Sequence, residues 1–217
     1  MSGHSLLLGH RGTRVSDTAA ENTLAAFDLA LQFGCHGFEF DVRRTACGTA
    51  VICHDEKVHG LSVATAACGQ LDSLPRLGDV LDRYASRAFM DIELKVPGLE
   101  SDTLVALREH PPERGYVVSS FLPEVLLELR ARSEEVSLGF ICDNKKTLDR
   151  WPEQPVEYVI PKHNLVTAQL VETVHHAGKT LLTWTVNDEK AMRRLADWGV
   201  DGIIADDPHL LVKTLPA

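Results

Sequence analysis

The chain has 217 residues, 44% of them hydrophobic, and its 31 acidic residues outnumber its 22 basic residues to give a net charge of -9. This length and composition predict a single domain over residues 1–217. The negative charge and the absence of any run of like charge longer than three residues argue against a nucleic acid partner. No apolar run approaches the roughly 18 residues that suggest a membrane span, so no integral membrane segment is expected.

The five cysteines are an odd number without a CxxC spacing, which argues against a disulfide framework and against a thiolate metal site. A strand-like segment begins almost at once, so a cleavable export signal is not expected either. Both observations predict a cytoplasmic protein.

Short apolar segments of β type alternate with amphipathic segments along the whole chain. Strands are predicted over residues 5–10, 36–42, 88–94, 115–120, 136–141, 156–160, 180–185 and 201–205. Helices are predicted over residues 22–33, 77–84, 123–132, 167–176 and 188–198. Strict alternation implies parallel strands with right-handed crossovers. Eight such units without a dinucleotide-type glycine motif favour a closed (β/α)₈ TIM barrel over a doubly wound sheet.

Residues 43–76 interrupt this alternation. They contain several turn-forming residues and a weak strand at 49–53. We expect a short irregular insertion here, lying over the mouth of the barrel.

Polar residues collect where the predicted strands end, which is where the loops of a TIM barrel build an active site. Glu39 and Asp41 are two residues apart in one strand, so their side chains share a face, and the same holds for Asp91, Glu93 and Lys95 in the next. The sequence therefore predicts acids on neighbouring strands that face the barrel interior.

Inward acids are costly to bury without a partner. A hard divalent cation would resolve their repulsion, and oxygen ligands suit Mg²⁺ or Ca²⁺ better than Zn²⁺. The alternative is that the acids form ordinary ion pairs with Arg11, Arg43 and Lys95.

His10 closes the first strand and His54 follows the weak strand at 49–53, and imidazole is the side chain suited to proton transfer near neutral pH. Arg11 and Lys95 would add fixed positive charge that could neutralise a phosphoryl group. The combination indicates chemistry on a phosphate ester.

With these residues identified, the sequence resembles the glycerophosphodiester phosphodiesterase family. The matching motifs are His10-Arg11-Gly12, Glu21-Asn22-Thr23, Glu39-Phe40-Asp41, His54-Asp55, Glu93-Leu94-Lys95, Ser120-Phe121, Trp184-Thr185-Val186-Asn187 and the segment from Asp201 to Pro208. Each motif is weak alone, whereas the ordered set is specific.

The resemblance implies a metal-dependent enzyme that hydrolyses glycerophosphodiesters to glycerol 3-phosphate and an alcohol. Its metal ligands would be Glu39, Asp41 and Glu93. His10 and His54 would be the acid–base pair. In this family the substrate's own glycerol hydroxyl is thought to attack first, giving a cyclic phosphate that water then opens.

The resemblance also assigns supporting residues. Arg11 and Lys95 would hold the phosphate, while Glu21 and Asn22 would support other site residues rather than touch substrate. Asn22 is also a candidate helix N-cap. Phe121 and Trp184 would form an apolar wall against the glycerol, with core packing as the alternative.

The chain departs from the family pattern after His54-Asp55, where the insertion is short and its sequence differs. A more open mouth could admit bulkier diesters, so an activity of the lysophospholipase D type, or a broader phosphodiesterase activity, remains an alternative. A barrel that binds phosphate without turnover is a second alternative. Head-group preference, the choice of cation and oligomeric state are left open.

Overall fold

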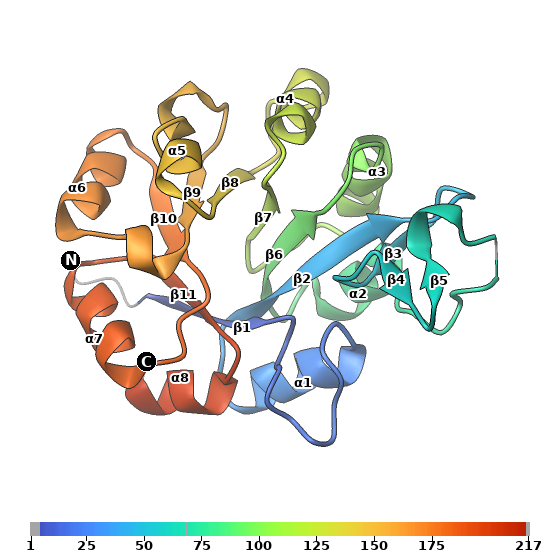
Figure 1. The fold of residues 1–217 in the computed structure, drawn as a ribbon, viewed down its shortest axis with the longest axis horizontal. Helices are drawn as coiled ribbons and strands as arrows, with labels where there is room; N and C mark the ends of the chain where they lie inside the picture. The colour runs from blue at the N-terminus through green and yellow to red at the C-terminus, as the bar shows by residue number, and fades with distance from the viewer. Residues whose placement is uncertain (1–4, 68, 216–217) are drawn as a thin grey trace.

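Eight parallel strands close into a barrel in a computed structural model that describes residues 5–67 and 69–215 (Figure 1). Hydrogen bonding runs through the strands in the order β1, β11, β10, β9, β8, β7, β6, β2, and β2 pairs with β1 to complete the ring. The strands are β1 Leu6–His10, β2 Gly37–Arg44, β6 Phe89–Leu94, β7 Tyr116–Ser120, β8 Leu138–Cys142, β9 Tyr158–Pro161, β10 Thr180–Thr183 and β11 Gly202–Ala205. The predicted (β/α)₈ barrel is confirmed.

Helices follow the strands and surround the barrel (Figure 1). They are α1 Leu24–Gln32, α2 Leu77–Tyr84, α3 Glu100–Glu109, α4 Pro123–Arg132, α5 Lys145–Leu148, α6 Ala168–His176, α7 Glu189–Asp197 and α8 Pro208–Thr214. The five helices predicted from the sequence are present, and α3, α5 and α8 complete the alternation.

Apolar side chains fill the barrel as well as the space between the barrel and its helices. The interior cluster comprises Leu8, Phe89, Val117, Ile141, Ile160, Leu182 and Ile204. A packed interior of this kind is the rule for the fold. It leaves the carboxyl ends of the strands as the place where polar side chains can face a cavity.

The insertion is more ordered than expected. Its first strand, β3 (Ala50–Ile52), extends the barrel sheet by pairing antiparallel with β2, as the predicted weak strand suggested. A hairpin of β4 (Lys57–Val58) and β5 (Leu61–Ser62) follows. The segment has a small apolar core of its own, formed by Val51, Cys53, Val63, Ala66 and Leu71. The hairpin was not predicted, because two-residue strands carry no periodic signal.

The cysteines differ from the expectation in one respect. Cys35, Cys53 and Cys142 are buried free thiols, whereas Cys47 is disulfide-bonded. The sequence argued against a disulfide framework, and the bonded Cys47 departs from that expectation. The cytoplasmic location stays a prediction. Within residues 5–67 and 69–215, no helix is both long enough and apolar enough to span a membrane.

Candidate active site

A cavity of about 170 Å³ lies at the carboxyl ends of the barrel strands. One side of it is charged and the other is apolar. The lining residues are His10, Arg11, Glu39, His54, Asp91, Glu93, Lys95, Phe121, Ile141, Ile160, Trp184 and Ile204. The residues that the sequence placed at separate strand ends therefore meet at one site.

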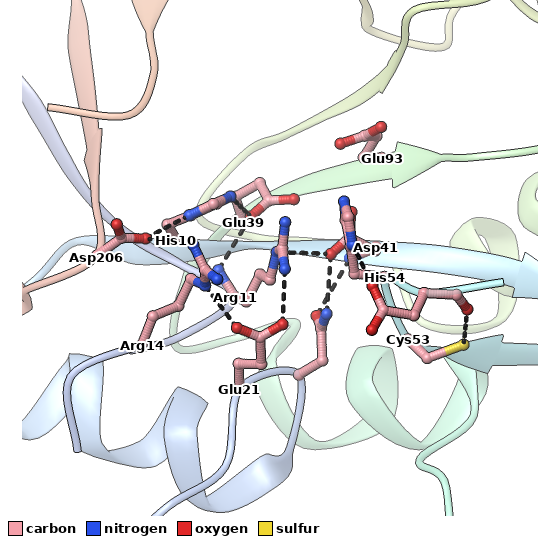
Figure 2. Close-up of polar contacts among 12 residues, drawn as sticks. His10, Arg11, Arg14, Glu21, Glu39, Asp41, Cys53, His54, Glu93 and Asp206 are labelled. Carbon is pink, nitrogen blue, oxygen red and sulfur yellow. Dashed lines mark hydrogen bonds and ion pairs between the residues drawn. The ribbon is translucent and has the colours of Figure 1, made fainter. Parts of the chain in front are cut away.

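Three buried carboxylates form the centre of the charged side, and we refer to Glu39, Asp41 and Glu93 as the acid cluster (Figure 2). Each offers an oxygen, and these oxygens lie within 4.8 Å of one another. The strand register explains this proximity, because Asp41 of β2 is directly paired with Glu93 of β6. Side chains two residues apart on β2 then share the same inward face.

Two cations neutralise part of the acid cluster. Nε of Arg11 lies 3.1 Å from Oδ2 of Asp41, and Nζ of Lys95 lies 3.2 Å from Oδ1 of Asp41 and 2.7 Å from Oε1 of Glu93. Burial alone would raise the pKa of Asp41, but Lys95 and Arg11 lower it overall. The ion-pair alternative is thus correct for Arg11 and Lys95, whereas Arg43 is bound elsewhere.

The site contains more buried carboxyl groups than Arg11 and Lys95 can neutralise. Burial, reinforced by Asp41 and the other nearby carboxylates, raises the pKa of Glu39 well above its usual value. Burial likewise raises the pKa of Glu93 and of Asp91 to about 7. Oε1 of Glu39 has no hydrogen-bond partner among the residues that the structure describes. An oxygen-rich, under-neutralised group of this kind fits a hard divalent cation.

His10 is held at the end of β1 by an acid from the opposite end of the chain. Its Nδ1 lies 2.6 Å from Oδ1 of Asp206, and its Nε2 lies 3.7 Å from Oε2 of Glu39 (Figure 2). Asn187 fixes Asp206 by two hydrogen bonds, donating from Nδ2 to Oδ2 at 2.6 Å and accepting from the backbone N–H at 2.9 Å. Burial is the main cause that lowers the pKa of His10.

His54 belongs to the insertion and is more open to solvent, with 36% of its side chain exposed. Its Nδ1 lies 2.8 Å from Oδ1 of Asp55. Its backbone carbonyl accepts a hydrogen bond of 2.7 Å from Nε of Arg43, which stands on β2. The insertion is therefore tied to the barrel at the residue that reaches the cavity.

The loop after β1 has an unusual backbone that brings Arg11 to the acid cluster. Arg11 and Gly12 both have positive φ values, 52° and 79°, and a Cβ on Gly12 would lie 2.5 Å from the carbonyl carbon of Ala26 in α1. Only glycine fits that close approach. The turn lets the backbone N–H of Arg11 donate to Oε2 of Glu39 at 3.0 Å.

Glu21 and Asn22 contact site residues from the same loop. Nη1 of Arg11 donates to Oε1 of Glu21 at 2.6 Å, and Nδ2 of Asn22 donates to Oδ2 of Asp41 at 2.8 Å. Asn22 is not the N-cap of α1, so that prediction is wrong. Thr23 caps the helix by accepting from the backbone N–H of Ala26, and Asn22 turns toward Asp41 with a positive φ of 59°.

The sequence matches a family profile described as the glycerophosphoryl diester phosphodiesterase family over residues 10–95 and 80–210. The chain belongs to this family. Membership makes it a phosphodiesterase of the hydrolase class.

Relatives with similar lengths support the assignment. A glycerophosphodiester phosphodiesterase of Caldanaerobacter subterraneus subsp. tengcongensis is 28% identical over 96% of this chain and 97% of its own. A crystal structure of a glycerophosphodiester phosphodiesterase from Thermotoga maritima matches with a TM-score of 0.82 at 25% identity, covering 97% of this chain and 98% of that one. A phosphodiesterase from Oleispira antarctica, solved with the product sn-glycerol-3-phosphate, shares the fold with a TM-score of 0.85 at 24% identity, covering 99% and 98%.

The apolar side of the cavity in this family member contains both aromatic residues predicted for it. The rings of Phe121 and Trp184 meet edge to face with centroids 5.5 Å apart. Nε1 of Trp184 donates to the backbone carbonyl of Ile160 at 3.0 Å, which fixes the indole. Both side chains line the cavity and pack on the barrel interior. Packing is therefore confirmed for both, and their contact with glycerol stays a prediction.

Three residues hold the histidines in place, a role that the sequence did not assign to them. Arg43 binds the carbonyl of His54, Asp206 binds His10, and Asn187 binds Asp206. Asp206 and Asn187 stand within the last two family motifs, which was the available signal. Their pairing with His10 depends on β1 and β11 being neighbours in the closed ring.

Proposed function

We propose that the chain hydrolyses glycerophosphodiesters to glycerol 3-phosphate and a free alcohol by acid–base catalysis between His10 and His54, assisted by a divalent cation. The observation that carries the proposal is the convergence of both histidines, two members of the acid cluster (Glu39 and Glu93), Arg11 and Lys95 on one cavity. Proton-transfer groups, metal ligands and phosphate-binding cations are the parts that hydrolysis of a diester needs.

Glu39, Asp41 and Glu93 would hold the cation, and their oxygen donors suit Mg²⁺ or Ca²⁺. When bound, such an ion supplies positive charge that stabilises the phosphoryl oxygens as negative charge develops on them. The unpartnered Oε1 of Glu39 supports this role, because the other charged groups of the site leave it unsatisfied.

His10 is suited to act first as the base. Its Nδ1 faces the carboxylate of Asp206, which keeps a proton on that nitrogen and leaves the Nε2 lone pair free. Burial lowers its pKa, so the ring is neutral near pH 7 and able to accept the proton of the attacking hydroxyl. His54, at the more exposed side of the cavity, would protonate the departing alkoxide.

In the second step the roles exchange, since a proton taken by His10 can be returned and His54 can activate water. Arg11 and Lys95 would bind the phosphate oxygens through both steps, offering charge-assisted hydrogen bonds. Phe121 and Trp184 would contact the carbon atoms of the glycerol and exclude water from that side.

A substrate panel tests the proposal. The purified protein is incubated with glycerophosphodiesters, lysophospholipids and bis(p-nitrophenyl) phosphate, each with Mg²⁺ or Ca²⁺. Release of glycerol 3-phosphate from the glycerophosphodiesters supports the proposal. Turnover confined to lysophospholipids would favour the lysophospholipase D type of activity, and no turnover with any substrate would favour a phosphate-binding barrel.

A further inference from the structure

Asp91 is a buried carboxyl group of the cavity that stands outside the acid cluster. It lies on β6 with 1% of its surface exposed, and it lines the cavity. Oδ1 accepts a hydrogen bond of 2.5 Å from Oγ of Ser119 on β7. Within the described residues, no side chain donates to Oδ2 and no lysine or arginine forms an ion pair with Asp91.

A buried carboxyl group with one hydrogen bond is costly, so its presence calls for a physical reason. Ser119 does not supply that reason, because a buried serine can be satisfied without a carboxyl group. The next residue, Ser120, shows this by donating to the backbone carbonyl of Leu94 at 2.8 Å. A second partner of Asp91 would therefore have to come from the cavity.

The surroundings define what that partner must be. Asp91 is paired in register with Glu39, which places it next to the acid cluster where the phosphate would bind. The same cavity is also lined by Ile141, Ile160 and Ile204, whose side chains offer no hydrogen bond. A group bound here needs carbon atoms for the isoleucines and a hydrogen-bond donor for Oδ2 of Asp91.

We propose that Asp91, held by Ser119, binds a hydroxyl group of the glyceryl part of the substrate. This inference rests on the proposed function, and it names the residues that would select a glyceryl group. If the central glycerol hydroxyl attacks phosphorus, the terminal hydroxyl remains to donate to Oδ2 of Asp91. The three isoleucines then contact the glycerol carbons.

Binding of two small phosphate esters tests the inference. Glycerol 3-phosphate has the terminal hydroxyl, whereas 2-hydroxypropyl phosphate lacks it and is otherwise the same. Both are titrated calorimetrically into the 217-residue protein in excess Mg²⁺ or Ca²⁺. Loss of a hydrogen bond that leaves a buried carboxyl oxygen without a partner predicts that glycerol 3-phosphate binds about ten- to a hundredfold more tightly than the analogue.

Variants test whether Asp91 causes the preference for glycerol 3-phosphate over 2-hydroxypropyl phosphate. Asp91→Leu should reduce the ratio of the two affinities to about one by weakening glycerol 3-phosphate binding. Asp91→Asn keeps an accepting oxygen, so the ratio of the two affinities should stay above one but below that of the unmodified protein. Ser119→Ala leaves Asp91 in place but frees its orientation, so it should also lower the ratio, and it serves if the leucine variant does not fold. The matched control is Glu100→Gln, a buried carboxyl group that binds the backbone N–H of Gly98 away from the cavity.

An unchanged ratio in the Asp91 and Ser119 variants would overturn the inference, and so would equal weakening of both ligands, which indicates a structural role. A ratio near one in the unmodified protein would also overturn it. The proposed function fails separately, through the absence of diester turnover, while these binding ratios can still be measured.

Discussion

Nδ1 of His10 lies 2.6 Å from Oδ1 of Asp206, although 196 residues separate them in the sequence. Closure of the barrel between β1 and β11 brings them together. Burial alone would raise the pKa of Asp206, but the hydrogen bond from His10 and the neighbouring groups lower it to about 2. Asp206 is therefore an anion at neutral pH, and it sets which nitrogen of His10 carries the proton.

Replacing Asp206 with asparagine should lower kcat at least about tenfold, because an amide can donate to Nδ1 and so favour the wrong tautomer of His10. Steady-state kinetics on a glycerophosphodiester measure the effect. Asp207→Asn is the matched control, because Asp207 caps α8 by accepting from the backbone N–H of Leu210 and asparagine is an equally good cap. Equal activities in the two variants would contradict the role given to Asp206.

Replacing either His10 or His54 with alanine should lower turnover by at least about a hundredfold, the usual scale for an acid–base group. Circular dichroism should show an unchanged fold, since each side chain faces the cavity and leaves the main core intact. Near-normal turnover in one variant would remove that histidine from the mechanism.

The hydrogen bond from Arg43 to the carbonyl of His54 predicts that replacing Arg43 lowers kcat more than replacing its neighbour Arg44 does. Arg43→Ala frees the insertion at the histidine and should lower kcat several-fold to tenfold with a smaller change in KM, because only the placement of His54 is disturbed. Arg44→Ala removes the same charge from the other face of β2 and should leave kcat near its original value. A comparable loss of kcat in both would indicate a general charge effect instead.

Much of this fold follows from local sequence patterns. The eight strands appear in the sequence as separate apolar runs. Two members of the acid cluster can be recognised there because Glu39 and Asp41 are two residues apart on one strand and therefore share a face. Family motifs add the histidines and the aromatic residues. These features depend on residues close together in the sequence.

The features that could not be predicted depend on contacts across the barrel or on backbone turns. The Asp206 contact requires the closed ring, and the contact of Arg43 with His54 requires the path of the insertion. Asn22 looks like a helix cap in the sequence, yet its left-handed backbone turns it to Asp41 and leaves the cap to Thr23. Local propensity cannot distinguish these two uses of an asparagine.

The raised carboxyl pKa values predict a link between pH, cation binding and stability. In the unfolded chain these groups titrate near pH 4, whereas Asp91 and Glu93 titrate at about pH 7 in the fold. The folded protein then binds more protons between about pH 4 and 7, so without a divalent cation the free energy of unfolding falls as pH rises through this window.

A bound cation relieves the repulsion between these carboxylates and competes with their protons. The increase in Tm on adding Mg²⁺ or Ca²⁺ should therefore be larger at pH 8 than at pH 5.5, as measured by differential scanning calorimetry. Glu39→Gln removes one proposed ligand and should reduce the increase at pH 8. An increase of the same size at both pH values would contradict this linkage.

The release of glycerol 3-phosphate from glycerophosphocholine by cation-stripped protein tests the central claim most directly. We predict no release in the presence of a chelator and recovery of release when Mg²⁺ or Ca²⁺ is restored in excess, because the proposed function places a cation on the acid cluster to offset its charge beside the phosphate. Hydrolysis at the same rate with and without the chelator would contradict the account.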